Sequence, residues 1–366
     1  MRILVYGMVG NHRGGIETFL LKMNQNMDED IIFDYVIEED ECIHEDTIKA
    51  RGGRIYYIAS RNKYPFKNIC ENCKLLSQLR GEVGAIYFNL SSLSWIFPIL
   101  IARCFSFSVF VHSHNADYIA ANSSLGYRVV NYINKRWLHV LNVKRLTCSK
   151  PATDFMFMPS DKVEMIFNAI NVERFAYNEE IRKMKRAELG IGEDVFLLGF
   201  VGRLQYQKNP LYLIKIMRLL ISYPNIELLI VGEGDMRKEM EDIVNKDALK
   251  QIHFLGNRVD VNELYSAMDL FILPSFHEGL PFVVVEAQSS GLYCLLSNYI
   301  TTEVDFTNNV VFLPLEENAE NWTRVIMSRS SQRDIDRKSI SAKSKESHFN
   351  IEREAKRLGK LLTNNN

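Results

Sequence analysis

Glu278 and Glu286 are the residues of this sequence whose types and spacing most clearly suggest chemistry. They lie in the stretch 274–287, which reads PSFHEGLPFVVVEA. Two carboxylates can accept hydrogen bonds from paired hydroxyl groups, or they can act together as an acid and a nucleophile in glycoside hydrolysis. On spacing alone, a solvated loop glutamate and a surface helix glutamate explain the same pattern equally well.

A strand, a loop and a helix are predicted around these two carboxylates. An apolar run ending at Leu273 indicates a buried parallel strand. Pro281 suits the first position of a helix, which we expect to run to about residue 290 and to be capped by Gly291. Glu278 then lies in the loop and Glu286 on the helix. Ligands bind at the carboxyl ends of strands in an open parallel sheet, and the free N–H groups of a helix start suit a phosphate or a sugar hydroxyl.

Arg203 and Lys208 follow another predicted strand, in the loop 202–210 with the sequence GRLQYQKNP. Either residue alone would be an ordinary surface cation. Together they could neutralise a diphosphate, the arginine as a two-pronged donor and the lysine as a point charge. Because they fall at strand ends of the same predicted domain as the two glutamates, the four residues indicate a binding site.

The first half of the chain offers a glycine pair and two histidines. Gly14 and Gly15 follow the first strand, where backbone amides could approach an anion, although the dinucleotide fingerprint GxGxxG is absent. A later strand runs into His112 and His114, which could contact a ligand, transfer a proton or bind a metal. No third metal ligand accompanies them in sequence, so contact with a substrate is favoured over a metal site.

The order of strands and helices predicts two doubly wound α/β domains in the 366 residues. The predicted strands cover residues 3–7, 33–37, 55–58, 85–89, 108–112 and 146–149, and then 195–201, 226–231, 252–255, 270–273 and 292–297. Lys and Arg total 44 against 45 Asp and Glu, giving a formal net charge of −1. Nothing in this charge balance indicates a nucleic-acid partner.

Three further segments have alternative interpretations. Cys70 and Cys73 form a lone CxxC within a helical pattern, and packing is favoured over metal or redox use because no second pair accompanies it. The six scattered cysteines fit a reduced cytosolic compartment. Residues 93–111 are apolar enough to be considered as a membrane span, but a buried helix over 93–104 and a strand over 108–111 explain them better. The helix predicted over 127–137 mixes basic and aromatic residues, so it either rests on an anionic membrane or presents a solvated basic face.

The combination of these motifs resembles glycosyltransferase family 4, whose members have the GT-B architecture and transfer sugars from nucleotide donors with retention of configuration. In the second half the resemblance is carried by Gly202-Arg203 with Lys208-Asn209-Pro210, by Val231-Gly232-Glu233-Gly234, by Phe254-Leu255-Gly256, and by Glu278 and Glu286 in their shared stretch. The first half adds Gly14-Gly15-Ile16-Glu17, His112-Ser113-His114-Asn115 and residues 166–171. The resemblance therefore covers nearly the whole chain.

The resemblance implies a role for each candidate residue. Glu286 would hold the ribose hydroxyls, Glu278 would lie against the donor sugar, and Arg203 with Lys208 would bind the diphosphate and stabilise it as it leaves. His114, or alternatively His112, would reach the donor sugar. The base would meet the backbone around Asn257 and Arg258. Gly14 and Gly15 would approach the phosphates or the acceptor, and the helix start at Gly279, Leu280 and Pro281 completes the predicted substrate-binding set.

The architecture implied by the family is two Rossmann-like domains facing across a cleft. The first, over 1–172, would be the acceptor side, and the second, over 173–345, the donor side, with a C-terminal helix at about 346–362 packing back onto the first. After Gly291 the family often has a proline and later a Gly-Gly pair, whereas Tyr293 and residues 300–303 stand there in this chain. This variant resembles members that build capsular polysaccharides or exopolysaccharides.

The function implied is a retaining glycosyltransferase that moves a sugar from a nucleotide sugar, expected to be a UDP-sugar, to a lipid-linked or growing glycan. No metal or other cofactor is expected. The expected location is cytoplasmic, at the inner membrane face, with peripheral contact to anionic membrane and no nucleic-acid partner. Two alternatives stay open: a non-catalytic nucleotide-sugar-binding subunit, and a glycoside hydrolase that uses Glu278 and Glu286.

Overall fold

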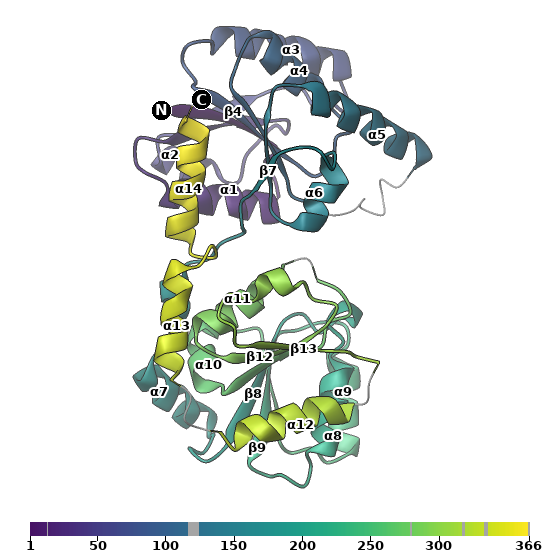
Figure 1. The fold of residues 1–366 in the computed structure, drawn as a ribbon, viewed down its shortest axis with the longest axis vertical. Helices are drawn as coiled ribbons and strands as arrows, with labels where there is room; N and C mark the ends of the chain where they lie inside the picture. Colours follow the sequence, from purple (N-terminus) through teal and green to yellow (C-terminus); the bar gives the residue numbers. More distant parts are fainter. Residues whose placement is uncertain (13, 116–123, 279, 317–318, 333–335, 365–366) are drawn as a thin grey trace. The chain divides into compact units, whose positions relative to one another are not determined.

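The computed structural model describes residues 1–12, 14–115, 124–278, 280–316, 319–332 and 336–364 (Figure 1). The chain divides into two compact units. Unit 1 comprises Met1–Ala169 and Ile351–Asn366, and unit 2 comprises Ile170–Asn350. Each unit is built on its own parallel sheet, as a doubly wound α/β chain requires.

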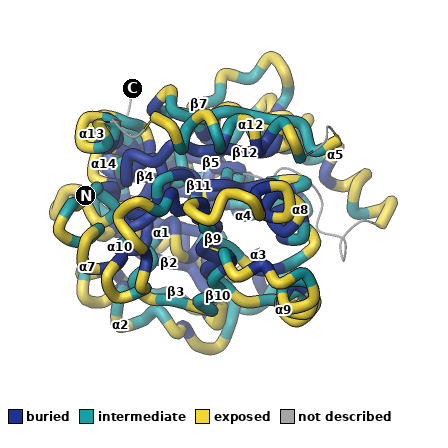
Figure 2. Tube along the Cα trace, turned by 90° about the horizontal axis from the view of Figure 1, so that it is seen from below, coloured by how far each residue is buried: buried dark blue, intermediate teal, exposed yellow. Residues whose placement is uncertain are grey.

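Unit 1 contains a seven-stranded parallel sheet within the described residues, in the order β3-β2-β1-β4-β5-β6-β7. Its strands are β1 (Arg2–Tyr6), β2 (Ile32–Ile37), β3 (Ile55–Tyr57), β4 (Ala85–Leu90), β5 (Val109–Ser113), β6 (Lys144–Thr147) and β7 (Val163–Met165). The central strands β1, β4 and β5 are almost entirely buried (Figure 2) because helices cover both faces. The strand order reverses between β1 and β4, so this is where a doubly wound sheet offers a binding crevice.

The helices of unit 1 include one from the far end of the chain. They are α1 (Gly15–Asn26), α2 (Glu45–Ala50), α3 (Pro65–Gln78), α4 (Phe97–Cys104), α5 (Leu125–Val140), α6 (Lys150–Met156) and α14 (Ile351–Thr363). Helix α14 lies beside α1 (Figure 1), and its apolar residues Ile351, Ala355, Leu358 and Leu362 recur every three or four positions and join the core. The C-terminal helix therefore belongs to unit 1.

Unit 2 contains a six-stranded parallel sheet within the described residues, in the order β10-β9-β8-β11-β12-β13. Its strands are β8 (Phe196–Val201), β9 (Ile226–Val231), β10 (Ile252–Gly256), β11 (Leu270–Leu273), β12 (Tyr293–Ser297) and β13 (Val310–Leu313). The order reverses between β8 and β11, which pair directly through Leu270 with Leu198. The loops that carry the candidate residues leave these two strands.

Helices lie on both faces of the second sheet (Figure 1). They are α7 (Glu179–Leu189), α8 (Leu211–Leu219), α9 (Arg237–Lys246), α10 (Val261–Ala267), α11 (Phe282–Ser289), α12 (Ala319–Ser330) and α13 (Arg337–Glu346), with short 3₁₀ turns η2 (Val172–Phe175), η3 (Tyr206–Lys208) and η4 (Thr302–Val304). Pro281 is the N-cap of α11 rather than its first residue, and Gly291 follows the helix with a φ of 68°. The predicted strand, loop and helix around Glu278 are thus confirmed.

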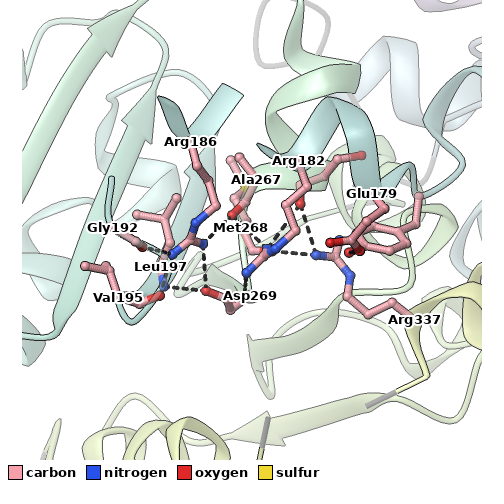
Figure 3. Close-up of polar contacts among 12 residues, drawn as sticks. Glu179, Arg182, Arg186, Gly192, Val195, Leu197, Ala267, Met268, Asp269 and Arg337 are labelled. Atoms are coloured by element: carbon pink, nitrogen blue, oxygen red, sulfur yellow. Dashed lines mark hydrogen bonds and ion pairs between the residues drawn. The ribbon is translucent and has the colours of Figure 1, made fainter. Parts of the chain in front are cut away.

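A cluster of arginines fastens the two ends of unit 2 to its core. Arg182 and Arg186 of α7 and Arg337 of α13 donate hydrogen bonds to the backbone carbonyls that end α10 (Figure 3), including that of Met268. Both α7 arginines also pair with the Asp269 carboxylate, at 2.6 and 3.2 Å. The carbonyls at a helix C-terminus lack intrahelical partners and carry partial negative charge, so they suit guanidinium donors. Burial still lowers the pKa of Arg337 to about 10.

Three predictions about elements need correction. The helix expected over 93–104 begins at Phe97, with Pro98 in its first turn, where the missing N–H of proline costs no intrahelical hydrogen bond. Strand β13 was not predicted: it is a short edge strand whose four residues are only half buried. The segment 163–171, expected to lead out of the first domain, begins with the edge strand β7.

The apolar stretch 93–111 folds into α4 and β5, as expected. Both elements contribute to one core cluster of unit 1, through residues such as Ile99 and Val111. None of the helices in the described part of the chain is both long and apolar enough to cross a membrane.

Candidate functional site

The loops after β8 and β11 are joined to one another at the strand-order reversal of unit 2. The backbone N–H of Phe276 donates to the Gln207 carbonyl at 2.9 Å, and the Gln207 side-chain amide donates to the His277 carbonyl at 3.0 Å. The rings of Tyr206 and Phe276 stack with centroids 4.9 Å apart. These contacts bring the predicted cationic loop and the predicted acidic loop together.

Lys208 and Glu278 form an ion pair across these loops. The Lys208 Nζ lies 2.6 Å from Glu278 Oε1, and the two side chains are only 17% and 8% exposed. A charge-assisted hydrogen bond of this length is among the stronger polar contacts in proteins. Two residues singled out separately in the sequence therefore meet as one charged pair. The pair is mostly covered by protein but keeps some contact with solvent.

Arg203 lies in the same loop as Lys208 but is used differently. It is exposed, and no side-chain hydrogen bond or ion pair links it to another described residue. A guanidinium that keeps five donors available can bind an anion without first giving up a protein partner. The site therefore combines a paired cation with one that has no described partner.

Glu286 is held by a tyrosine that the sequence did not single out. It lies on the second turn of α11, half buried, and its Oε2 accepts a hydrogen bond from the Tyr265 hydroxyl at 2.9 Å. Burial raises the pKa of Tyr265 well above its usual range, so the hydroxyl stays protonated and keeps donating. The same hydroxyl lies 3.3 Å from the Val283 carbonyl. Tyr265 thus positions the Glu286 carboxylate.

The loop after β9 approaches the β8 loop too closely for any side chain. Gly232 has a φ of 133°, and a Cβ there would lie 2.0 Å from the Gly202 carbonyl oxygen. A Cβ at Gly234 would lie 2.4 Å from the Leu204 carbonyl oxygen. The motif Val231-Gly232-Glu233-Gly234 therefore sets the path of the loop that carries Arg203.

The remaining predicted residues of unit 2 differ in exposure. Asn257 is exposed, directly after β10. The Arg258 guanidinium donates to Asp260 at 2.7 and 2.8 Å and to Glu188 at 3.0 Å, which holds the pKa of the Asp260 carboxyl well below its usual range. Its side chain thus joins a salt-bridge cluster with α7, and only its backbone is left for a ligand.

At the start of α11, Leu280 is half buried and Pro281 is buried. Gly279 lies outside the described residues. The contacts predicted for the backbone of this helix start stay predictions.

In unit 1, a buried glutamate shapes the glycine loop after β1. Glu17 accepts hydrogen bonds from the backbone N–H groups of Val9 and Gly14, both at 3.0 Å. A Cβ on Gly14 would lie 2.5 Å from the Glu17 carboxylate, whereas a Cβ on Gly15 would meet no atom within 4 Å. A side chain at Gly14 would therefore displace the Glu17 carboxylate from its hydrogen bonds, whereas Gly15 borders open space.

The two histidines after β5 are not equivalent. His112 is fully buried, and its Nδ1 lies 2.5 Å from the Tyr87 hydroxyl. His114 is partly exposed, and its Nε2 lies 2.9 Å from Asn89 Oδ1. Burial lowers the pKa of both imidazoles, that of His114 to about 3, so both rings are neutral near pH 7. Of the pair, His114 is the one that a ligand could reach in unit 1.

A cavity of about 740 Å³ lies at the strand-order reversal of unit 1. It is bordered by the ends of β1 and β4 and by Asn89, the residue that holds His114. Its polar lining includes Glu38, Glu39, Arg61, Asn62, Ser91, Ser92 and Ser94, and Trp95 adds an aromatic ring. The sequence did not single out any of these lining residues, because they come from three separate loops, which follow β2, β3 and β4.

The described residues do not form a recognisable metal site. Within the described part of the chain, no group of three or more His, Cys, Asp or Glu side chains is arranged to hold a metal ion. Cys70 and Cys73 lie on helix α3, where Cys70 is exposed and Cys73 is half buried, and all six cysteines of the chain are free thiols. The packing interpretation therefore does not extend to Cys70.

Comparison with known proteins shows a family match over most of unit 2. Residues 181–347 match the family described as "Glycosyl transferases group 1". The Bacillus subtilis protein named "Putative glycosyltransferase EpsF" is 29% identical over 333 residues, which cover 88% of this chain and 86% of that protein. The Escherichia coli protein named "UDP-Gal:alpha-D-GlcNAc-diphosphoundecaprenol alpha-1,3-galactosyltransferase" is 28% identical over 260 residues, covering 67% of this chain and 66% of that protein.

A solved structure shares the fold of the whole chain. Anabaena Alr3699/HepE, determined in complex with UDP, matches with a TM-score of 0.77 at 16% identity, covering 99% of this chain and 100% of that one. The likeness extends over both parallel-sheet units. The chain accordingly has the GT-B fold, and its residues 181–347 are similar to the group 1 glycosyltransferases.

Proposed function

We propose that this protein is a retaining glycosyltransferase that moves a sugar from a nucleotide sugar, most simply a UDP-sugar, to a lipid-linked or growing glycan. The UDP complex of the Anabaena structure and the donor named in the E. coli relative support the choice of base. The name of that relative also gives a diphosphoundecaprenol-linked acceptor. An acceptor of this kind would be used at the cytoplasmic face of the membrane.

The observation that carries the proposal is the pairing of Lys208 with Glu278 beside Arg203. When the bond between sugar and diphosphate breaks, negative charge develops on the departing phosphate oxygens. Arg203 can bind that charge directly, and Lys208 can turn from Glu278 to the diphosphate while Glu278 accepts hydrogen bonds from sugar hydroxyls. Preorganised donors of this type contribute about 10²–10³-fold to turnover when measured one at a time.

The other residues would bind and orient the donor. Glu286, held by Tyr265, has a carboxylate oxygen pair suited to the two ribose hydroxyls. The backbone at Asn257 and Arg258 would meet the base, since the Arg258 side chain is committed to its salt-bridge cluster. His114, neutral and partly exposed, would donate or accept a hydrogen bond at the sugar. Gly15 would let the acceptor or a phosphate approach the backbone.

The cavity of unit 1 suits the acceptor saccharide. Carboxylates, amides and serine hydroxyls can pair with sugar hydroxyls, and Trp95 can pack against the apolar face of a sugar ring. Its two glutamates, Glu38 and Glu39, would disfavour the diphosphate of the nucleotide. Glu38 is bound to Arg61 at 2.9 Å, which limits the free negative charge in the cavity.

The glycoside hydrolase alternative fits the geometry less well. A hydrolase needs one carboxyl group as an acid and the second as a nucleophile or base. Glu278 is instead paired with a lysine, and Glu286 accepts a hydrogen bond from a tyrosine. Each carboxylate is thus already bound by a different side chain, which fits an acid and nucleophile pair less well than separate ligand contacts.

Donor turnover tests the proposal. Release of UDP from a panel of UDP-sugars is measured with a lipid-linked acceptor for the native chain, Glu286→Ala and Tyr265→Phe, with the exposed Glu239→Ala as the matched control. We expect a large loss for Glu286→Ala, a smaller rise in donor KM for Tyr265→Phe, and an unchanged rate for the control. Equal rates for the native chain and Glu286→Ala would refute the assignment.

Two further outcomes separate the alternatives. Tight donor binding without turnover on any acceptor would favour the non-catalytic subunit, and glycan hydrolysis without nucleotide release would favour the hydrolase. Because Arg203 and Lys208 supply positive charge at the diphosphate, we expect the transfer rate to be insensitive to a chelator. Thermal shift with each nucleotide sugar would rank the donors, since a bound donor raises apparent stability.

A further inference from the structure

Helix α5 presents most of its apolar residues outward and packs against unit 1 mainly through polar residues. Leu125, Val129, Val130, Ile133, Trp137 and Val140, which we call the apolar face of α5, are between 42% and 79% exposed. At about 100° per residue they fall within an arc of about 140° on one side of the helix. Figure 2 shows most of α5 as exposed.

The side that α5 turns toward unit 1 is largely polar. Asn131 accepts a hydrogen bond from the Leu93 N–H at 2.7 Å, and Asn134 donates to the Leu93 carbonyl at 2.6 Å. Lys135 donates to the Asp154 carbonyl at 2.7 Å, and Leu138 is the buried apolar residue of this side. A surface helix normally buries its apolar stripe and exposes its polar face. The reversed arrangement leaves an exposed apolar face on α5 in the described part of the chain, a feature typical of an interaction surface.

The charges and aromatic residues of α5 indicate which partner this is. The exposed cations of the helix are Arg128 and Arg136, since Lys135 is turned inward to the Asp154 carbonyl, and the helix carries no acidic residue. The Arg136 guanidinium lies over the Tyr132 ring at 4.8 Å, so a cation and an aromatic ring lie together at the Leu125 edge of the apolar face, and Trp137 lies near its other edge. Apolar residues flanked by cations, with Trp and Tyr at the edge, match the boundary between the acyl chains and anionic headgroups of a lipid bilayer.

A second copy of the chain fits this surface poorly. A two-fold interface would place α5 against α5, and each helix would bring its arginines toward those of the other with no carboxylate on either helix to pair with them. We propose that α5 is a membrane-docking helix that seats unit 1 on an anionic lipid surface. The inference does not depend on transfer activity, because it concerns binding in the absence of any donor.

Vesicle sedimentation of the full chain tests the proposal. Vesicles of phosphatidylglycerol with phosphatidylcholine are compared with vesicles of phosphatidylcholine alone. The triple variant Leu125→Gln, Val129→Gln and Ile133→Gln should bind anionic vesicles at least about tenfold more weakly than the native chain. The matched control replaces three exposed apolar residues elsewhere, Phe66→Gln, Leu219→Gln and Ile221→Gln, and should bind as the native chain does.

A charge variant separates the two contributions. Arg128→Gln with Arg136→Gln should weaken binding to anionic vesicles by about fivefold for each charge removed, and should leave the weak binding to phosphatidylcholine unchanged. Circular dichroism checks that each variant is folded. The proposal is overturned if the native chain does not bind anionic vesicles, if the triple variant binds as well as the native chain, or if light scattering shows a dimer that the triple variant abolishes.

Discussion

Breaking the Lys208–Glu278 pair should reveal a strong energetic coupling between the two side chains. At 2.6 Å, the Coulomb attraction of two unit charges is about 1.6 kcal/mol in water and about 6 kcal/mol at an effective dielectric constant of 20. Both side chains are mostly covered, so loss of hydration offsets much of the larger value. Hydrogen bonds to charged groups contribute about 1.5–3 kcal/mol net, and we expect a coupling of about 2 kcal/mol.

The assay is a double-mutant cycle read by a fluorophore in unit 2. The chain has three tryptophans, and Trp322 is the one in unit 2, fully buried on α12. In a background of Trp95→Phe and Trp137→Phe, its fluorescence reports the urea unfolding of unit 2 alone. Lys208→Met and Glu278→Gln are measured singly and together, and the coupling is the departure from additivity.

A control cycle combines Lys208→Met with Glu239→Gln, an exposed residue of α9. This cycle should be additive within about 0.5 kcal/mol. A coupling below about 0.5 kcal/mol for Lys208 with Glu278 would refute the argument that the pair is a strong, partly buried contact.

The same pair should oppose nucleotide binding. Because Lys208 must leave Glu278 to bind a diphosphate, Glu278→Gln should bind UDP more tightly, by at most about 30-fold for a coupling of about 2 kcal/mol. Lys208→Met should bind UDP more weakly. Titration calorimetry with UDP distinguishes the two, and equal weakening by both variants would show that Glu278 does not restrain the lysine.

Three other predictions follow from the geometry. Gly232→Ala places a Cβ 2.0 Å from a backbone oxygen and should lower the free energy of unfolding by about 2–4 kcal/mol, whereas Gly15→Ala meets open space and should unfold as the native chain does; equal stabilities would contradict this. Burial lowers the pKa of His114 to about 3, from 6.5, so the unfolded chain binds more protons between these values. Stability is then fully present above pH 6.5 and falls by up to about 1.4 kcal/mol for each pH unit below it. His114→Asn should therefore show a shallower decline in urea midpoints between pH 7 and pH 5. Arg337→Met should lower the free energy of unfolding of unit 2 by about 2–3 kcal/mol because the α10 carbonyls lose their donors, while the exposed Lys338→Gln should not.

The fold was predictable because its strands are buried and continuous. Strands such as β8 and β11 are apolar throughout, and a glycine or proline directly follows each of them. The edge strand β13 escaped prediction for the opposite reason: four half-buried residues carry no period that distinguishes a strand from a loop. Helix α14 was expected from the family resemblance. Its apolar residues are few, but they pack against α1 and join the core of unit 1.

The proximity of the two loops was predictable, but the pairing of their side chains was not. Parallel strands end at one edge of a sheet, so the sequence placed Arg203, Lys208 and Glu278 together without knowing their contacts. The Lys208–Glu278 pair depends on side-chain conformations in two loops seventy residues apart. Tyr265 could not be found either, because a tyrosine on an amphipathic helix carries no signal that its hydroxyl will hold Glu286. Side-chain networks of this kind arise only after the backbone is folded.

Helix α5 shows why periodicity alone cannot settle function. A period of 3.6 residues locates the apolar side of a helix but does not say whether that side faces the core or the surroundings. In α5 the answer comes from Asn131 and Asn134, whose amides satisfy the backbone of Leu93 and so fix the polar side inward. Apolar residues of the remaining side must then face outward, and the sequence could not decide this because the contact with Leu93 exists only in the folded unit. The outward side of α5 therefore exposes apolar side chains such as Leu125 and Trp137, not only a solvated basic face. Moving these side chains from water into an apolar environment is favourable, which is the driving force for the membrane docking proposed above.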